Sequence, residues 1–374
     1  MTAEPTHERP APPSPRRSIP GLAALVLVFA GGACVSPRRG TAPRPPSSMQ
    51  RSVVGAAWDD PQRCVTAVNA GARFSRAHFR ARVVTWALDA FPDGPAGDGT
   101  SLEWLACALT WLDADVVALQ RLRLDGAAGD ALREVVRRLN DGTHAGWQWQ
   151  SDLCPGAGRL HVVFLWRSDR VNVTLVATHP EADTSPHLDI AHPDCPGTLT
   201  PALAAHVEMR AGGLDFHLLT TELAPGDAVE ALRRRSDAWR ALATVARARQ
   251  ALRPDPDVLV AAAFNAVGAV GTNPTSAIRE RQALATTLAT LSPAFGLYEP
   301  ADGCTEYAGA TARQTDFFVA SAGMEEVKGL TPRVAGVCGA MRCREIDPSA
   351  YAALRQLSRH CPVVFDLNDR DVDG

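Results

Sequence analysis

The sequence is nearly devoid of lysine, carries little net charge and lacks any long apolar segment. Lys328 is the only lysine, and the resulting skew towards arginine indicates genome composition more than a binding surface. A formal net charge of −3 excludes a global basic field that would draw the chain to nucleic acid. No cysteine and histidine spacing is typical of a zinc site, and no internal repeat is present. What remains is an ordinary globular composition with 46% apolar residues, enough for a sizeable core.

The N-terminal region has the pattern of a secretory signal. Two arginines precede an apolar run at 21–30, which is too short to span a bilayer comfortably. The small residues before Cys34 resemble a bacterial lipobox, although Gly31 stands where a leucine-like residue is usual. We therefore expect 1–34 to be a signal peptide and Cys34 to be the lipidated first residue of a lipoprotein at the bacterial cell envelope. Ordinary cleavage nearby, with a free Cys34, stays open.

Residues 35–79 are rich in proline, arginine and serine at their start, a linker composition, and they lead into the folded domain. Nine cysteines in the chain favour an oxidising compartment. With the lipobox cysteine set aside, the other cysteines are even in number, which permits full pairing but fixes no connectivity. We expect a disulfide between Cys338 and Cys343 first, and one between Cys154 and Cys195 second. Cys107 lies in a helical pattern and is expected to be a buried thiol.

The hydrophobic pattern alternates between strands and helices. Strands are expected at 82–86, 115–120, 161–166, 171–176, 203–209, 214–221, 257–263, 316–320 and 362–366, and helices at 101–112, 130–139, 228–252 and 275–291. The pairs 161–166 with 171–176 and 203–209 with 214–221 have hairpin signals. Because hairpins are combined with strand–helix crossovers, we predict mixed sheets packed face to face beneath outer helices.

The strand at 257–263 is the centre of this prediction. A buried strand that ends in a polar turn delivers side chains to the rim of a sheet, where α/β proteins tend to keep their chemistry. Here the delivered residues are Ala263, which can neither coordinate nor hydrogen-bond through its side chain, and Asn265, which can do both.

Short motifs in a fixed order carry a family resemblance. They are Thr85-Trp86 with Phe91, the stretches 115–120, 164–170 and 218–221, Phe264-Asn265, Thr315-Asp316, and the stretch 358–363. In this order they resemble the endonuclease/exonuclease/phosphatase superfamily, the deoxyribonuclease I-like fold. The resemblance covers 80–368, leaves 369–374 as a tail, and implies an α/β four-layer sandwich.

That family cleaves phosphate esters with Mg²⁺ or a similar divalent ion, assisted by a histidine–aspartate pair and a second histidine. Position by position, the resemblance retains Asn265, Asp316 and His360. The reacting positions otherwise differ: Ala87 replaces an Asn, Arg121 the metal-binding Glu, Glu222 a catalytic His, Ala263 an Asp and Arg359 another Asp.

The replacements argue against a metal. Two unit charges about 4 Å apart near a protein surface interact by roughly 4 kcal/mol, so Arg121 turns a large attraction for a divalent ion into a comparable repulsion. We therefore expect no metal and no cofactor. Asp89 and Asp93 follow the first motif, and we expect them to be solvated turn residues, as acids after a strand usually are, rather than replacement ligands.

Two alternatives stay open at the surviving residues. Asp316 and His360 form either a relict acid–base dyad or a structural hydrogen-bonded pair. Arg121 and Arg359 either bind a phosphate or another anion, or pair internally with Glu222 or Asp316.

The function predicted from these residues is a secreted or lipid-anchored, non-catalytic binding or scaffold protein. Its partner is unknown, a phosphate-containing or other anionic ligand is possible, and contact with the membrane is expected through the lipid anchor. The alternative is a divalent-metal-dependent phosphodiesterase or nuclease, using Mg²⁺ or Mn²⁺ with atypical active-site residues.

Overall fold

A computed structural model describes residues 55–78, 80–152, 154, 160–179, 202–253, 255–271, 275–301 and 303–372. The predicted signal peptide with Cys34, most of the predicted linker, and Cys195 lie outside these residues. All described residues belong to one compact unit, Pro45–Gly374. None of the helices in the described part of the chain has the length and apolarity needed to cross a membrane.

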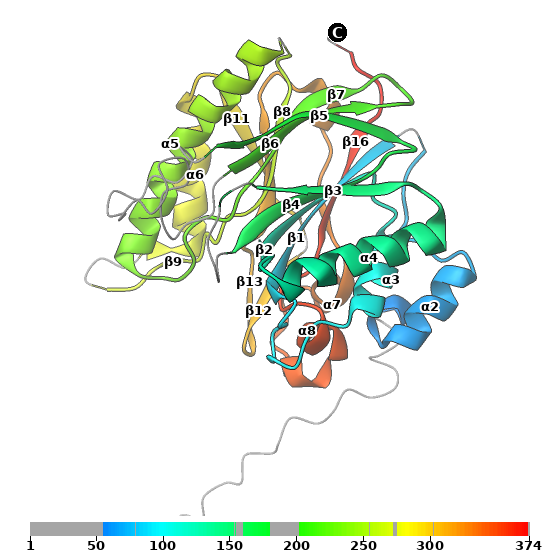
Figure 1. Ribbon diagram of the computed structural model, residues 1–374. Coiled ribbons are helices and arrows are strands. Elements are labelled where there is room, and N and C mark those ends of the chain that lie inside the picture. Colours follow the sequence, from blue (N-terminus) through cyan, green and yellow to red (C-terminus); the bar gives the residue numbers. More distant parts are fainter. Residues whose placement is uncertain are drawn as a thin grey trace, which may run out of the picture. The chain divides into compact units, whose positions relative to one another are not determined.

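The first six-stranded sheet contains the first four strands of the chain and its last two strands (Figure 1). Its order is β15 (Arg333–Val334), β16 (Val363–Asn368), β1 (Arg80–Phe91), β2 (Val116–Leu122), β4 (His161–Arg167) and β3 (Trp147–Ser151). β1 and β2 are parallel and the other pairs are antiparallel, so the sheet is mixed.

The second six-stranded sheet has the order β11 (Phe295–Tyr298), β14 (Asp316–Ser321), β8 (Val258–Ala263), β7 (Asp215–Thr220), β6 (Ala202–Met209) and β5 (Val171–His179). Here β7 and β8 are the parallel pair. Two small ribbons pair β9 (Gly268–Ala269) with β10 (Thr275–Ser276) and β12 (Glu306–Ala308) with β13 (Thr311–Arg313).

The two sheets pack face to face through alternate residues of their strands. Val83, Ala118 and Phe164 of the first sheet belong to the same buried cluster as Leu218 and Phe318 of the second. Alternation along a strand sends the intervening residues to the outer faces, where helices cover them.

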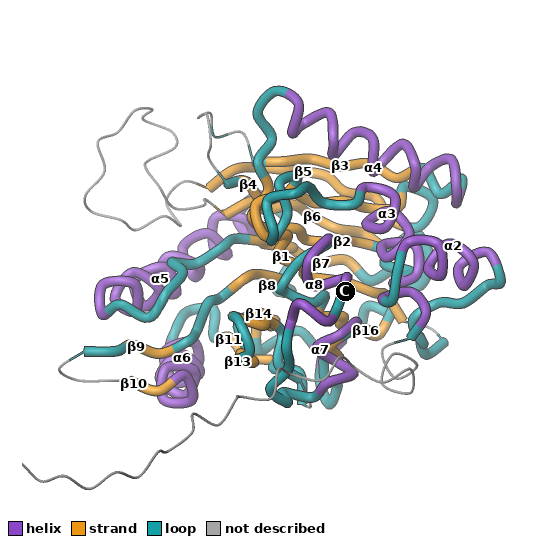
Figure 2. Tube along the Cα trace, turned by 90° about the horizontal axis from the view of Figure 1, so that it is seen from below, coloured by secondary structure: helices purple, strands orange, loops and turns teal. Residues whose placement is uncertain are grey.

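The helices form the two outer layers. They are α2 (Pro61–Asn69), α3 (Leu102–Leu112), α4 (Ala127–Thr143), α5 (Val229–Leu252), α6 (Ala277–Thr290), α7 (Gly336–Met341) and α8 (Ala352–Gln356), with 3₁₀ turns η1 (Ala56–Trp58), η3 (Glu325–Val327) and η4 (Pro348–Ala350). Figure 2 shows α5 and α6 on one side of the sheets and α2, α3 and α4 on the other. Separate apolar clusters join each group of helices to its sheet. The predicted fold, an α/β four-layer sandwich with two mixed sheets, is confirmed.

The residues before β1 are part of this fold. Trp58 is buried and packs edge-on against Trp86, and a disulfide joins Cys64 of α2 to Cys107 of α3. The prediction of a free buried thiol at Cys107 is therefore wrong. Its partner lies 43 residues earlier in the chain, so the helical pattern around Cys107 carried no signal for the pairing.

One of the two predicted hairpins is wrong. The segments β4 and β5 are strands, but they lie in different sheets: β4 pairs with β2 and β3, whereas β5 pairs with β6. The turn between them passes from one sheet to the other, and Arg167 and Arg170 hold it by ion pairs to Asp113. The second predicted hairpin, β6 with β7, is confirmed.

The predicted disulfide between Cys338 and Cys343 is also wrong. Cys338 pairs with Cys361, and Cys343 pairs with Cys304. The two cysteines separate because α7 buries Cys338 and ends at Met341, and Cys343 then follows in a left-handed conformation with φ of 61°. Cys154 is disulfide-bonded, but Cys195, its expected partner, lies outside the described residues.

Candidate functional site

The residues expected at the site come together at one edge of the sandwich. Ala87 and Arg121 lie near the carboxyl ends of the parallel strands β1 and β2. Glu222 and Ala263 lie at the carboxyl ends of β7 and β8, and the antiparallel β14 begins at Asp316 next to Ala263. Parallel strands end at a common edge, so the order of strands alone brings these positions together.

Arg121 occupies the middle of this edge. It sits at a bulge in the pairing of β2 with β4 and has φ of 67°, a strained conformation for a residue with a side chain. The preceding Gln120 points between the sheets and donates to Thr85 Oγ1 and Thr220 Oγ1. The bulge therefore lets consecutive residues serve two purposes, with Gln120 inside the sandwich and Arg121 at its rim.

The Arg121 guanidinium contacts three side chains, two of them at positions that the family resemblance marks as reacting. Its Nη1 lies 3.3 Å from Asp89 Oδ1 and its Nε lies 3.4 Å from Glu222 Oε1. Nη1 also lies 3.0 Å from Nε2 of His360. Since a guanidinium can only donate, His360 Nε2 is the acceptor in this contact. Pairing with Glu222, one of the alternatives left open for Arg121, is thus present.

Arg359 pairs with Asp89 rather than with Glu222 or Asp316. Its backbone N–H donates to Asp89 Oδ2 at 2.8 Å, and its Nε and Nη2 donate to the two oxygens at 3.1 and 3.2 Å. The Arg359 side chain remains 43% exposed, whereas that of Asp89 is 3% exposed. Asp89 therefore binds both arginines at once.

His360 and Asp316 form the expected pair. His360 Nδ1 lies 2.9 Å from Asp316 Oδ2, which also accepts from Thr315 Oγ1 at 3.0 Å. Trp86 Nε1 donates to the His360 carbonyl at 2.9 Å, so the segment that leads into β16 is tied to β1. The Nδ1–H of His360 donates to Asp316, which leaves Nε2 directed at Arg121.

Burial and neighbouring charges shift the pKa of His360 in opposite directions. Burial lowers the pKa of His360, but the carboxylates of Asp316, Glu306 and Asp89 outweigh it and raise the pKa to about 9. The Arg121 contact opposes this rise, because a proton on Nε2 would face a guanidinium N–H at 3.0 Å. A ring with Nε2 as acceptor is neutral, and a ring protonated in line with this raised pKa has no free lone pair at either nitrogen.

The acids of the site differ in their affinity for protons. Burial raises the pKa of Asp89, but His360, Arg359 and Arg121 outweigh it and bring the pKa down to about 2. Burial raises the pKa of Glu222 above its usual value, and Arg121, His360 and Asn265 only partly oppose this. Asn265 itself is held by its Nδ2, which donates to the Leu223 carbonyl at 2.7 Å.

Asp89 is buried and paired with two arginines, so the prediction that it is a solvated turn residue is wrong. It lies within β1, two residues after Ala87, and residues two apart along a strand share a face. That spacing is the signal that could have identified it. Asp93 does behave as expected, because its side chain is 51% exposed and pairs with Arg123 at 2.5 Å.

A second cluster has no counterpart in the sequence interpretation. His206, Asp215 and Asp255 lie at the opposite ends of β7 and β8 from Glu222 and Ala263. Their separation along the chain gives no motif, so only the pairing of β6, β7 and β8 reveals the group.

Comparison with solved structures shows the fold. An endonuclease/exonuclease/phosphatase family protein from Bacteroides thetaiotaomicron aligns with a TM-score of 0.51 and 13% identity, covering 80% of this chain and 98% of that chain. The human Nocturnin catalytic domain with bound sulfate aligns with a TM-score of 0.49 and 17% identity, covering 78% and 96%. A mannosyl-6-phosphatase from B. thetaiotaomicron gives 0.47 and 14%, covering 77% and 99%. Comparison with protein-family models and with curated protein sequences gave no match.

Proposed function

The chain has the endonuclease/exonuclease/phosphatase fold, and on that premise we propose that it is a non-catalytic binding or scaffold protein whose hydrolytic metal chemistry has been replaced by internal ion pairs. The observation that carries this proposal is the position of Arg121. Its guanidinium contacts Asp89, Glu222 and His360, at the edge where the resemblance implies a divalent ion.

The donor set at this edge does not fit a divalent ion. Arg121 lies between Asp89 and Glu222, so a further cation there would meet a positive charge at short range. In the described part of the chain, donor atoms of three acidic, histidine or cysteine residues converge closely enough for one ion at His206, Asp215 and Asp255 and nowhere else. Ala87 and Ala263 supply no ligand atoms of their own.

The histidine is equally ill placed for general base catalysis. A base needs a free lone pair within hydrogen-bond reach of the proton it removes. Nδ1 of His360 is bound to Asp316, and Nε2 accepts from Arg121 at 3.0 Å. Neither ring nitrogen is therefore available to an attacking water while Arg121 stays in place.

An anionic ligand remains a component of the proposal. Arg359 is partly exposed beside Arg121, and a guanidinium suits a phosphate or carboxylate group. Because both arginines already share Asp89, such a ligand would compete with that carboxylate. We therefore place the anion at the solvent side of Arg359.

A hydrolysis assay tests the central claim. Tag-free protein is incubated with plasmid DNA and with a generic phosphodiester in Mg²⁺ or Mn²⁺, and no turnover above a buffer blank is expected. Turnover that a chelator abolishes and that His360→Ala removes would establish the enzyme instead. The same assay on Arg121→Glu asks whether restoring an acid at this position restores any metal dependence.

The anion component has a separate test. Inorganic phosphate and a nucleoside monophosphate are added in thermal-shift experiments to the wild type and to Arg359→Gln. Stabilisation of the wild type alone supports the anion site. Equal shifts in both proteins contradict it and leave the non-catalytic proposal standing.

The cellular location forms a further part of the proposal: export, and lipidation at Cys34. The disulfides of the described domain are compatible with an oxidising compartment. Metabolic labelling with a fatty acid is expected to mark the wild type and to fail with Cys34→Ser. Labelling that survives the substitution would contradict lipidation at this residue.

A further inference from the structure

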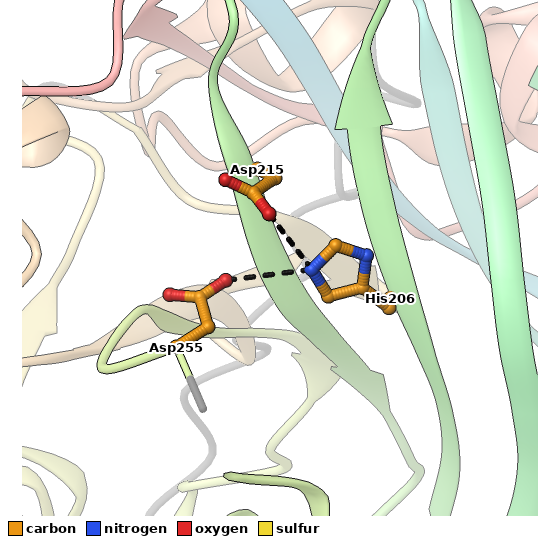
Figure 3. A group of neighbouring side chains, drawn as sticks. All are labelled: His206, Asp215 and Asp255. Carbon is orange, nitrogen blue, oxygen red and sulfur yellow. Dashed lines mark ion pairs between the residues drawn. The ribbon is translucent and has the colours of Figure 1, made fainter. Parts of the chain in front are cut away.

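His206, Asp215 and Asp255 form a compact group on the face of the second sheet that α5 covers (Figure 3). His206 lies on β6, Asp215 begins β7, and Asp255 lies in the connection from α5 to β8. The group is roughly 20 Å from Glu222, given about 3.3 Å per residue along β7. It is therefore a separate site from the Arg121 cluster.

The three side chains bring one ligand atom each to within 4.8 Å of one another. Nε2 of His206 lies 3.1 Å from Asp215 Oδ2 and 3.5 Å from Asp255 Oδ2, and Figure 3 shows both carboxylates facing the same ring nitrogen. Ligand atoms bound about 2.0–2.1 Å from a tetrahedral Zn²⁺ lie about 3.3 Å apart. The observed separations bracket that value.

These contacts do not give the ring nitrogens of His206 a hydrogen bond. His206 is 0% exposed, yet neither of its ring nitrogens has a hydrogen-bond partner, and Asp255 Oδ2 also lacks one. Buried polar atoms are nearly always paired, so each of these needs an explanation.

A second histidine–aspartate pair in the same chain shows that a separation of this length does not by itself prevent a hydrogen bond. His161 Nδ1 lies 3.1 Å from Asp152 Oδ1 and does make a hydrogen bond. At His206 the same 3.1 Å separation to Asp215 lacks hydrogen-bond geometry. The ring nitrogen of His206 therefore faces two carboxylates without a hydrogen bond to either, and a shared cation would satisfy all three groups.

The charges around the group also favour a cation of charge two. Two carboxylates would be neutralised by one divalent ion, with the imidazole as a neutral third ligand. The group lies beside the C-terminal end of α5, whose last carbonyl groups favour positive charge. Arg253 Nη2 donates to Asp215 Oδ2 at 3.0 Å and supplies only part of the balance, because its side chain is 44% exposed.

We propose that His206, Asp215 and Asp255 bind a divalent first-row transition metal ion, for which Zn²⁺ is the best chemical match. An imidazole with two carboxylates suits Zn²⁺, and solvent molecules complete its coordination. The ion fastens the connection between α5 and β8 to β6 and β7. Its role is structural, and it is independent of the chemistry at Arg121.

Zinc titration of the tag-free, full-length chain tests the proposal. The protein is stripped with a chelator, dialysed and titrated with ZnCl₂ in a calorimeter, and parallel samples receive Co²⁺ for visible absorption of the bound ion. The wild type is expected to bind one ion per chain and to melt at a higher temperature with zinc. Asp215→Asn and Asp255→Asn should each weaken binding at least about 100-fold, since losing even an outer-shell partner costs about 10–100-fold.

Two controls make the result decisive. Asp93→Asn removes an exposed acid at the other edge and should leave zinc affinity unchanged. Circular dichroism of the metal-free variants establishes that they are folded. An absence of saturable zinc binding by the wild type, or an affinity that either folded Asn variant leaves unchanged, overturns the proposal.

Discussion

The two ends of β7 and β8 carry the same kinds of side chain, acids and a histidine, but differ in the positive charge that accompanies them. At the carboxyl ends, Glu222 and its neighbours surround Arg121, which supplies the positive charge from within the chain. At the amino ends, Asp215 and Asp255 surround the ring of His206, with Arg253 only at the margin. In the first group a guanidinium lies between the acids, although Glu222 Oε2 and Asp316 Oδ1 make no hydrogen bond. In the second group both ring nitrogens of the buried histidine lack a hydrogen bond.

The comparison shows that acids and a histidine do not by themselves identify a metal site. A buried carboxylate needs a compensating charge, and an arginine or an ion can provide it. Where an arginine is already present, removing it should be costly and adding a metal should do little. Where no arginine lies between the acids, losing a charge in the metal-free protein should cost little, and adding a metal should stabilise the protein. The following predictions test this contrast in order of expected effect.

The largest effect is expected from Arg121→Met, which removes the charge and retains the length of the side chain. Breaking a buried ion pair costs about 3–5 kcal/mol, because Glu222 and Asp89 lose a compensating charge. Urea unfolding measures the loss. Arg123→Met is the matched control, since its pair with Asp93 is exposed and should contribute no more than about 1 kcal/mol. Equal losses in the two variants would contradict the assignment of Arg121.

The second prediction concerns the disulfide between Cys338 and Cys361, which adjoins His360. Replacing both cysteines by serine should cost about 3 kcal/mol, because the bond closes a loop between residues 23 apart. The same variant should bind zinc with unchanged affinity. A parallel loss of zinc binding would show that the two ends of the sandwich are coupled.

The third prediction is a pH dependence that comes from Asp89. Its pKa falls from 3.8 to about 2 on folding, so its contribution is complete above pH 3.8 and is lost as the pH falls towards 2. The shift corresponds to about 2 kcal/mol. Between pH 5 and pH 2.5, urea unfolding should show a steeper loss for the wild type than for Asp89→Asn. Parallel curves would mean that Asp89 is not bound as described.

The smallest effect is expected from Asp255→Asn in metal-free protein. Without the ion, Asp255 lies near Asp215 and lacks a hydrogen bond at Oδ2, so losing its charge should change stability by less than about 1 kcal/mol. In saturating zinc the same substitution should destabilise the protein relative to the wild type. A large loss without metal would contradict the view that an ion, and not the chain itself, holds Asp255.

Much of the fold was predictable because it depends on local periodicity. The strand at 258–263 and the helix at 229–252 follow directly from runs of apolar residues and their spacing. The hairpin between β4 and β5 failed because a short turn between two strands does not reveal whether they remain in one sheet. The pairing of Cys338 failed because the nearest cysteine in sequence was not the nearest in space.

The candidate site likewise has a part that the sequence predicts and a part that it does not. The differences from the family motifs at Ala87, Arg121 and Ala263 can be read from the sequence, because those motifs are local. The role of Asp89 depends on which face of β1 it occupies and on how two arginines converge from β2 and from the segment before β16. No window of sequence contains that convergence.

The sequence by itself determined which elements form, which faces they bury and which positions depart from the motifs that it resembles, because each depends on residues a few positions apart. The tertiary structure alone decided which charges meet. Strands paired across large separations brought Arg121 to Asp89 and Glu222, and brought Asp255 to His206. Coulomb interactions depend on distance in space, and the chain order does not encode that distance locally.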